Sequence, residues 1–219
     1  MSDDQRLRVV ALISGSGSNL QALLDAQSAG LPMQCVAVIS NRGDAKGLDR
    51  AHHHDIPTAV LNHRDYPDRD TYDAALRHLV DGYEPELVVL AGFMRILTPA
   101  FVNHYRGRML NIHPSLLPKF RGLHTHQRAL DAGETEHGAS VHFVTAELDG
   151  GPVILHARVP VQPDDDATSL AARVLQQEHQ IYPTVVRWFA QGRLRLGEDG
   201  QVWLDDAPLQ PSCSDDRAQ

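Results

Sequence analysis

The stretch LRVVALISGSGSNLQALLDA, residues 7–26, determines the class of fold that we expect. It opens with an unbroken apolar run that ends at glycines, which is typical of a strand buried on both faces of a parallel sheet. A glycine-containing turn follows, and a helical pattern then predicts a helix from Ser18 to Ala29. A strand, a tight turn and a helix in this order indicate the first βα unit of an α/β protein.

The same alternation of strand and helix continues to residue 113. Further strands are expected at 34–40, 58–62, 87–93 and 109–113, and further helices at 45–54 and 69–82. Strands that alternate with helices form βαβ units, in which helices cover both faces of a parallel sheet. We therefore expect a Rossmann-like fold with a mostly parallel central sheet.

The pattern changes after Pro118. Strands with alternating polarity are expected at 139–145 and 153–161, a long amphipathic helix at 168–190, and a hairpin at 193–205. Alternating polarity indicates strands with one wetter face, so we expect an antiparallel extension of the sheet toward the C-terminus. Thr168 is expected to cap the long helix, and Pro183 to kink or divide it.

The composition is that of an ordinary globular protein. The chain has 219 residues, of which 42% are hydrophobic and 22% charged. A net charge of −8 argues against a nucleic-acid partner, because such binding depends mainly on Lys and Arg. No apolar run approaches the ~20 residues of a membrane span, and the acidic N-terminus does not resemble a signal peptide, so we expect a cytoplasmic protein. The two cysteines, Cys35 and Cys213, are not expected to pair, and no spacing predicts a metal site.

The turn after the first strand has the character of a phosphate site. Gly15 and Gly17 permit a tight turn, and the helix behind them offers unpaired N–H groups. Ser18 and Asn19 add side-chain donors. Leu20 stands where the dinucleotide fingerprint has its third glycine, which disfavours NAD or FAD. A single phosphate ester is expected, although a turn without a ligand is the alternative.

A second group of polar residues lies at the end of the strand 109–113. Asn111 and His113 share one face of that strand, and Asp149 follows a later strand in the turn LDGG. A carboxylate beside His113 would raise the imidazole pKa above its reference of ~6.5, and imidazolium with an amide would stabilise an oxyanion. No GxSxG motif is present, so the group favours direct acyl transfer to an amine. A structural histidine and an ordinary turn are the alternatives.

Four stretches together carry a family resemblance. They are ISGSGSNLQALLDA, VVLAGFMRIL, LNIHPSLLPKFRGLHTHQRALDAGETEHGASVHFVTAELDGGPVI and QQEHQIYPTVVRWFAQGRLRL. The chain resembles the phosphoribosylglycinamide formyltransferase family (glycinamide ribonucleotide transformylases) from about Leu7 to Leu204. The resemblance implies formyl transfer from 10-formyltetrahydrofolate to the amine of glycinamide ribonucleotide in purine biosynthesis, with no metal.

The resemblance also assigns residues. It implies that His113 polarises the formyl oxygen as an acid, that Asp149 raises the pKa of His113 and assists proton transfer, and that Asn111 holds the oxyanion. Contacts to the ribonucleotide are implied for Gly17, Ser18, Asn19 and Glu178. Contacts to the folate are implied for Arg69, Met94, Arg95, Ile96, Leu97, Asn111, Thr145, Ala146, Glu147, Leu148 and Asp149. Leu175 departs from the polar residue that a member of the family has one helical turn before Glu178. Ser140 and His142 are expected to support the site through hydrogen bonds.

The resemblance also suggests an organisation. We expect one formyltransferase domain over 1–219, with a nucleotide-binding half at 7–115, a folate-site half with the C-terminal helix and hairpin at 116–205, and a disordered tail at 206–219. Small-molecule substrates, no membrane, and a monomer or weak homodimer are expected. Residues 119–134 are expected to contain a mobile lid, and the run His52–His54 is expected to be a solvated helix end.

Three other functions are alternatives to formyl transfer to the ribonucleotide. A hydrolase of 10-formyltetrahydrofolate would use the same catalytic residues, but it would carry an N-terminal regulatory domain, and only six residues precede the first strand here. A formyltransferase acting on methionyl-tRNA would need an added nucleic-acid-binding domain and a basic surface. A nucleotide-binding module would not need Asn111, His113 and Asp149.

Overall fold

The structure is a computed structural model that describes residues 6–210 and 212–213. The chain divides into two compact units, with the division between Leu110 and Asn111. The functional halves expected at 7–115 and 116–205 stay a prediction.

The first unit contains a parallel sheet. Its strands are β1 (Leu7–Ile13), β2 (Met33–Ser40), β3 (Thr58–Val60) and β4 (Leu87–Leu90), in the order β4-β1-β2-β3. Strand β1 pairs in parallel with both β2 and β4, and β2 pairs in parallel with β3. Almost all side chains of β1, β2 and β4 are buried, as the continuous apolar runs predicted.

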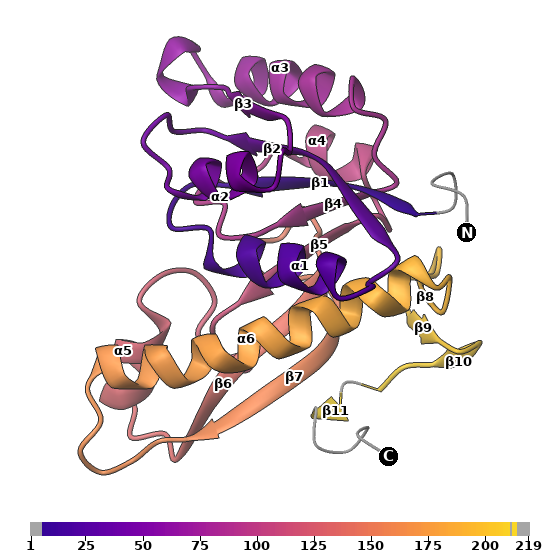
Figure 1. Ribbon diagram of the computed structural model, residues 1–219. Helices are drawn as coiled ribbons and strands as arrows, with labels where there is room; N and C mark the ends of the chain where they lie inside the picture. The colour runs from indigo at the N-terminus through magenta and orange to yellow at the C-terminus, as the bar shows by residue number, and fades with distance from the viewer. Residues whose placement is uncertain (1–5, 211, 214–219) are drawn as a thin grey trace. The chain divides into compact units, whose positions relative to one another are not determined.

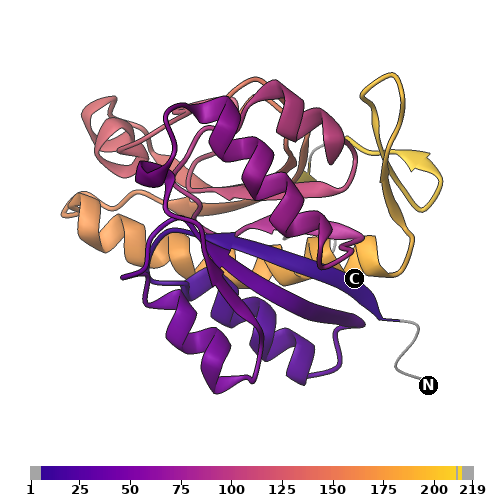
Figure 2. The same ribbon diagram turned by 90° about the horizontal axis from the view of Figure 1, so that it is seen from above.

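Helices cover both faces of this sheet. They are α1 (Ser18–Ser28), α2 (Gly47–His53), α3 (Arg69–Asp81) and α4 (Pro99–His104), with a 3-10 turn η2 (His63–Asp65). Helices α1 and α2 lie on one side of β1 and β2, and α3 lies on the other (Figure 2). The sequence did not predict α4, which has six residues and is too short for a periodic pattern. Its start is nevertheless marked by Thr98, whose side chain accepts a hydrogen bond from the Phe101 N–H.

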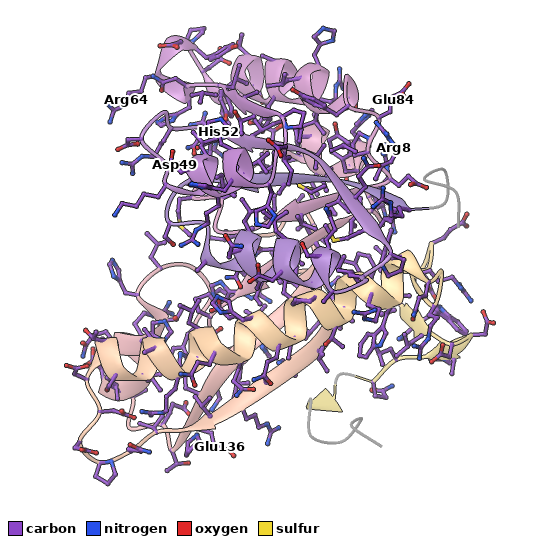
Figure 3. All side chains as sticks on the ribbon, in the orientation of Figure 1. Arg8, Asp49, His52, Arg64, Glu84 and Glu136 are labelled. Carbon is purple, nitrogen blue, oxygen red and sulfur yellow. The ribbon has the colours of Figure 1, made fainter. Side chains whose placement is uncertain are left out.

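Figure 3 labels polar residues of the first unit near the start of β1 and on α2. At one edge, the Arg8 guanidinium donates to the backbone carbonyls of Tyr83 and Glu84, which ties β1 to the segment before β4. On α2, Asp49 and His52 are exposed (Figure 3). His52 and His53 end this helix in solvent, as expected, whereas His54 is half-buried and its Nε2 lies 3.2 Å from Nε2 of Gln21.

The second unit is built on an antiparallel pair of strands. β5 (Met109–His113) crosses the division between the units, and β6 (Glu136–Phe143), β7 (Val153–Pro160) and β11 (Ser212–Cys213) follow it in the order β5-β6-β7-β11. Strands β6 and β7 are antiparallel, while β7 and β11 are parallel. A short helix α5 (Thr125–Asp131) precedes β6, and the long helix α6 (Ala167–Ala190) lies along β6 and β7 (Figure 1). A small antiparallel sheet contains β8 (Leu194–Leu196), β9 (Val202–Leu204) and β10 (Ala207–Pro208).

Helix α6 differs from the prediction at two points. It runs without interruption through Pro183, although a proline removes one hydrogen bond of a helix. Buried side chains on both sides of this proline, including Tyr182 and Val185, pack into the second unit, and this burial offsets the lost bond. The N-cap is Asp166 rather than Thr168: its carboxylate accepts from the N–H of Ser169, whose hydroxyl accepts from the N–H of Asp166.

The expected α/β class, mostly parallel with antiparallel pairing toward the C-terminus, is confirmed by these strand pairings. The tail differs in part from the expected disorder, because Ala207–Pro208 and Ser212–Cys213 form short strands. Residues 211 and 214–219 lie outside the described residues. Within the part of the chain that the structure describes, no helix combines the length and apolar character needed to cross a bilayer.

Candidate active site

Three side chains from two stretches of the second unit meet at the end of β5. Asn111 and His113 extend from the same face of the strand. The Nδ1 atom of His113 lies 3.5 Å from Oδ2 of Asp149, and Nδ2 of Asn111 lies 3.5 Å from Oδ1 of the same carboxylate. The side chains of His113 and Asp149 are only 8% and 9% exposed, so this pair is largely protected from water. The structure thus brings together the three residues that the sequence singled out for catalysis.

A backbone carbonyl determines which ring nitrogen of His113 faces the carboxylate. Nε2 of His113 lies 3.0 Å from the carbonyl oxygen of Phe120. A carbonyl can only accept, so Nε2 carries a hydrogen and Nδ1 is the ring nitrogen that faces Asp149. Phe120 has a φ of 54°, a left-handed conformation that turns its carbonyl toward the histidine.

Asn111 is oriented by a second histidine. Nδ1 of His142 lies 2.9 Å from the carbonyl of Phe143, so Nδ1 is the donor. Burial lowers the pKa of His142 and keeps the ring neutral, which leaves its Nε2 as an acceptor. Nδ2 of Asn111 donates to this nitrogen at 3.1 Å. The other amide hydrogen points toward Asp149 at 3.5 Å, a weak contact that an incoming oxygen can replace.

The turn that carries Asp149 has a specific backbone conformation. Asp149 has a φ of 47°, and its Oδ2 accepts a hydrogen bond of 2.9 Å from the N–H of Gly122. A Cβ atom at Gly151 would lie 1.8 Å from the carbonyl oxygen of Phe143. The second glycine of LDGG is therefore required for close packing, and the turn holds the carboxylate beside β5.

A buried hydroxyl positions the segment that contacts His113. Ser140 is fully buried; its Oγ accepts from the N–H of Leu117 at 3.0 Å and donates to the carbonyl of Ser115 at 2.6 Å. Nδ1 of His156 lies 2.9 Å from the same oxygen. Since the single hydroxyl hydrogen goes to Ser115, His156 must donate from Nδ1. Sequence reasoning identified Ser140 and His142 as supporting residues but missed Phe120, Gly122 and His156.

The turn after β1 in the first unit keeps the features of an anion site. Gly17 is the N-cap of α1 with a φ of 70°, and no side chain caps the helix there. A helix start without a side-chain cap is typical of an anion site. A Cβ at Gly17 would lie 2.5 Å from Cα of Gly47, so the start of α2 touches the turn directly. Sequence reasoning did not foresee Gly47.

The residues expected to contact folate have two kinds of environment. In the first unit, Met94 is 68% and Ile96 47% exposed, whereas Leu97 is buried. The Arg95 guanidinium lies 4.4 Å from the centre of the Tyr72 ring, and Arg69 is exposed at the start of α3. In the second unit, Ala146, Glu147 and Leu148 are exposed and Thr145 is half-buried. Exposed large apolar side chains of this kind suit an aromatic ligand.

The remaining expected residues lie on α6. Glu178 is 7% exposed, and Leu175, one turn before it, is half-buried.

Among the described residues, no group of three or more His, Cys, Asp or Glu side chains could hold a metal ion. Burial raises the pKa of the Cys35 thiol to about 12, so this cysteine is unreactive as a nucleophile.

Comparison with known proteins defines the class. A family model described as formyl transferase matches residues 7–186, and the chain therefore belongs to the formyl transferase family. The chain is 56% identical to the phosphoribosylglycinamide formyltransferase of Escherichia coli (strain K12), over 94% of this chain and 97% of that protein. It is 47% identical to the protein of the same name from Haemophilus influenzae, with the same coverage.

A solved structure agrees with these relatives. The phosphoribosylglycinamide formyltransferase of Coxiella burnetii superimposes with a TM-score of 0.92 at 53% identity, and the match covers 95% of this chain and 99% of that one. Within the formyl transferase family, this chain therefore groups with the phosphoribosylglycinamide formyltransferases.

Proposed function

We propose that this chain transfers the formyl group of 10-formyltetrahydrofolate to the amine of glycinamide ribonucleotide, a step of purine biosynthesis. The observation that carries the proposal is the meeting of Asn111, His113 and Asp149 at the end of β5, in a chain 56% identical to a phosphoribosylglycinamide formyltransferase. An imidazole, an amide and a carboxylate in contact suit acyl transfer, which requires both oxyanion stabilisation and proton removal.

The transfer is direct. The amine nitrogen of the ribonucleotide attacks the formyl carbon, and the oxygen becomes negatively charged. His113 donates a hydrogen bond from Nδ1 to this oxygen, and Asn111 donates the amide hydrogen that otherwise points toward Asp149. Asp149 accepts the proton that the amine loses. The bond between the formyl carbon and the folate nitrogen then breaks as the carbonyl re-forms, and Asp149 passes the proton it received to that nitrogen, which restores the carboxylate.

Residues of each unit are assigned substrate contacts in this proposal. The N–H groups at Gly17, Ser18 and Asn19 bind the phosphate of the ribonucleotide together with the Ser18 hydroxyl, and the start of α1, which has no side-chain cap, supports this role. Glu178 contacts the ribonucleotide from α6. The folate is bound by Arg69, the exposed apolar side chains of the segment 94–97, and the segment 145–149. The proposed steps require no metal.

The decisive experiment measures consumption of 10-formyltetrahydrofolate with and without glycinamide ribonucleotide. Consumption that requires the ribonucleotide and yields the formylated amine supports the proposal. Consumption with water alone would identify a hydrolase instead. As a separate test of the phosphate site, Ser18→Ala is expected to raise KM for the ribonucleotide more than KM for the folate; equal effects on both would contradict the assignment.

We also propose that the enzyme works in the cytoplasm as a monomer or weak homodimer. Analytical ultracentrifugation across a range of protein concentrations tests the second part. A single species larger than a dimer at the lowest concentration would contradict it.

A further inference from the structure

We propose that Arg121 is a positioning residue of the formyl-transfer site, acting through an ion pair with Glu147. This inference rests on the proposed function. The Nη1 atom of Arg121 pairs with Oε1 of Glu147, and this pair joins two segments of the second unit, 120–122 and 147–149. Neither side chain contacts Asn111, His113 or Asp149 in the interactions that the structure records, so both act through their neighbours in the chain.

The first segment contains two backbone groups that touch the catalytic residues. Arg121 stands between Phe120, whose carbonyl accepts from Nε2 of His113 at 3.0 Å, and Gly122, whose N–H donates to Oδ2 of Asp149 at 2.9 Å. A shift of Arg121 moves both of these groups. The hydrogen bond that sets the tautomer of His113 and the one that holds the Asp149 carboxylate therefore depend on one short stretch of backbone.

The second segment is shaped to bring Glu147 to this position. The N–H of Gly150 donates to the carbonyl of Glu147 at 3.1 Å, which closes the turn that carries Asp149. A Cβ atom at Gly150 would lie 2.4 Å from Cδ of Glu147. The absence of a side chain at 150 thus makes room for the Glu147 carboxylate, which folds back over the turn toward Arg121.

A third contact fixes Arg121 from the other side. The guanidinium of Arg128, on α5, donates to the backbone carbonyls of Arg121 at 2.6 Å and Leu123 at 3.2 Å. The same guanidinium lies 5.5 Å from the centre of the Phe120 ring. Arg128 therefore holds the backbone of the 120–122 segment, while Arg121 joins it to the 147–149 segment.

The size of the effect follows from the exposure of the pair. The side chain of Arg121 is 38% exposed and that of Glu147 is 66% exposed. Exposed ion pairs contribute about 0.2–1 kcal/mol, which corresponds to a change of at most about fivefold. Such a pair is also screened by salt, with a screening length of about 3 Å at 1 M ionic strength. We therefore expect a modest, salt-sensitive contribution to kcat.

The test compares kcat for formyl transfer at saturating concentrations of both substrates. Arg121→Gln and Glu147→Gln are each expected to lower kcat about two- to fivefold, and Arg121→Lys, which keeps the charge, to retain most of the rate. The charge-reversed double variant, Arg121→Glu with Glu147→Arg, is expected to exceed both of its single components. At about 1 M NaCl the wild type should fall to the level of Arg121→Gln, which itself should respond little.

A matched ion pair in the same loop serves as the control. Lys119 pairs with Glu134 at 2.8 Å, and its side chain is also exposed. Lys119→Gln is expected to leave kcat and its salt response unchanged. Thermal unfolding of each variant shows whether it is folded.

The outcomes separate this inference from the proposed function. A wild type that transfers no formyl group to the ribonucleotide would refute the function. An active wild type with an Arg121→Gln variant of equal kcat and equal salt response would refute only the positioning role. Failure of charge reversal to exceed the single variants, in folded protein, would refute it as well.

Discussion

Replacing Asp149 by Asn tests the proposed mechanism most directly, because the substitution keeps the shape of the side chain. Oδ2 of Asp149 faces the Gly122 N–H at 2.9 Å and Nδ1 of His113 at 3.5 Å, while Oδ1 faces Nδ2 of Asn111 at 3.5 Å and lies 3.9 Å from Nε2 of His142. The amide that replaces the carboxylate is expected to keep its oxygen on the side of Gly122, so the turn remains closed. What is lost is the negative charge and the ability to accept a proton.

The expected cost can be estimated in two ways. Loss of a general acid or base typically reduces a rate by about 10²–10⁴, or roughly 3–5 kcal/mol. The attraction between a carboxylate and an imidazolium at this separation is on the order of 4 kcal/mol for an effective dielectric constant of about 20. Both estimates predict that kcat falls by about a thousandfold.

The assay is formyl transfer by Asp149→Asn, His113→Ala and the double variant, with thermal unfolding of each. Residues that act as one unit are not additive, so the double variant should be about as slow as the slower single variant. Asp81→Asn, which removes the negative charge beside the Tyr105 hydroxyl in the first unit, is the control and should alter stability but not kcat. Multiplicative losses in the double variant, or an Asp149→Asn rate within about tenfold of wild type, would refute the reasoning.

Three further predictions concern stability. Burial lowers the pKa of His137 to about 4, below the ~6.5 of an unfolded histidine, so the unfolded state binds its proton first. The unfolding free energy therefore keeps this contribution above about pH 6.5 and loses up to about 1.4 kcal/mol per pH unit between about pH 6.5 and 4. In urea unfolding, His137→Phe should lose less unfolding free energy on acidification than the wild type. In Gly138→Ala the new Cβ would lie 1.9 Å from the carbonyl oxygen of Ala157, so we expect the unfolding free energy to fall by about 1–3 kcal/mol or more. An unchanged urea midpoint would contradict the β6–β7 register. Pro183→Ala restores a helical N–H and should stabilise the protein by about 1–3 kcal/mol, measured by the same unfolding. An unchanged or lower unfolding free energy would contradict this expectation.

Much of the fold could be predicted because local patterns decide it. The runs at β1, β2 and β4 are buried on both faces, and their residues read as continuous apolar stretches. Helices α1 and α3 begin within a residue of the predicted start. The misjudged points depend on tertiary packing. Pro183 lies in an unbroken helix because side chains on both sides of it are buried, and no local rule reveals that burial.

The candidate site shows the same division. Asn111 and His113 could be found because polar side chains at the end of an apolar strand are conspicuous, and Asp149 because of its glycine-rich turn. Phe120 and Gly122 could not be found, since they act through a backbone carbonyl and a backbone N–H that nearly every residue possesses. His156 was missed because the hydroxyl it contacts, on Ser140, is a neighbour only after β6 and β7 pair.

The contact between Gly17 and Gly47 limits how this protein can diverge. A methyl group on Gly17 would overlap the backbone of Gly47, and a methyl group on Gly47 would overlap the side chain of Ile13. A single substitution at either position must therefore displace the start of α2 or the end of β1 before it can be accommodated. Descendants of this sequence are expected to change these two positions only together with compensating changes around them, whether or not the substrate changes.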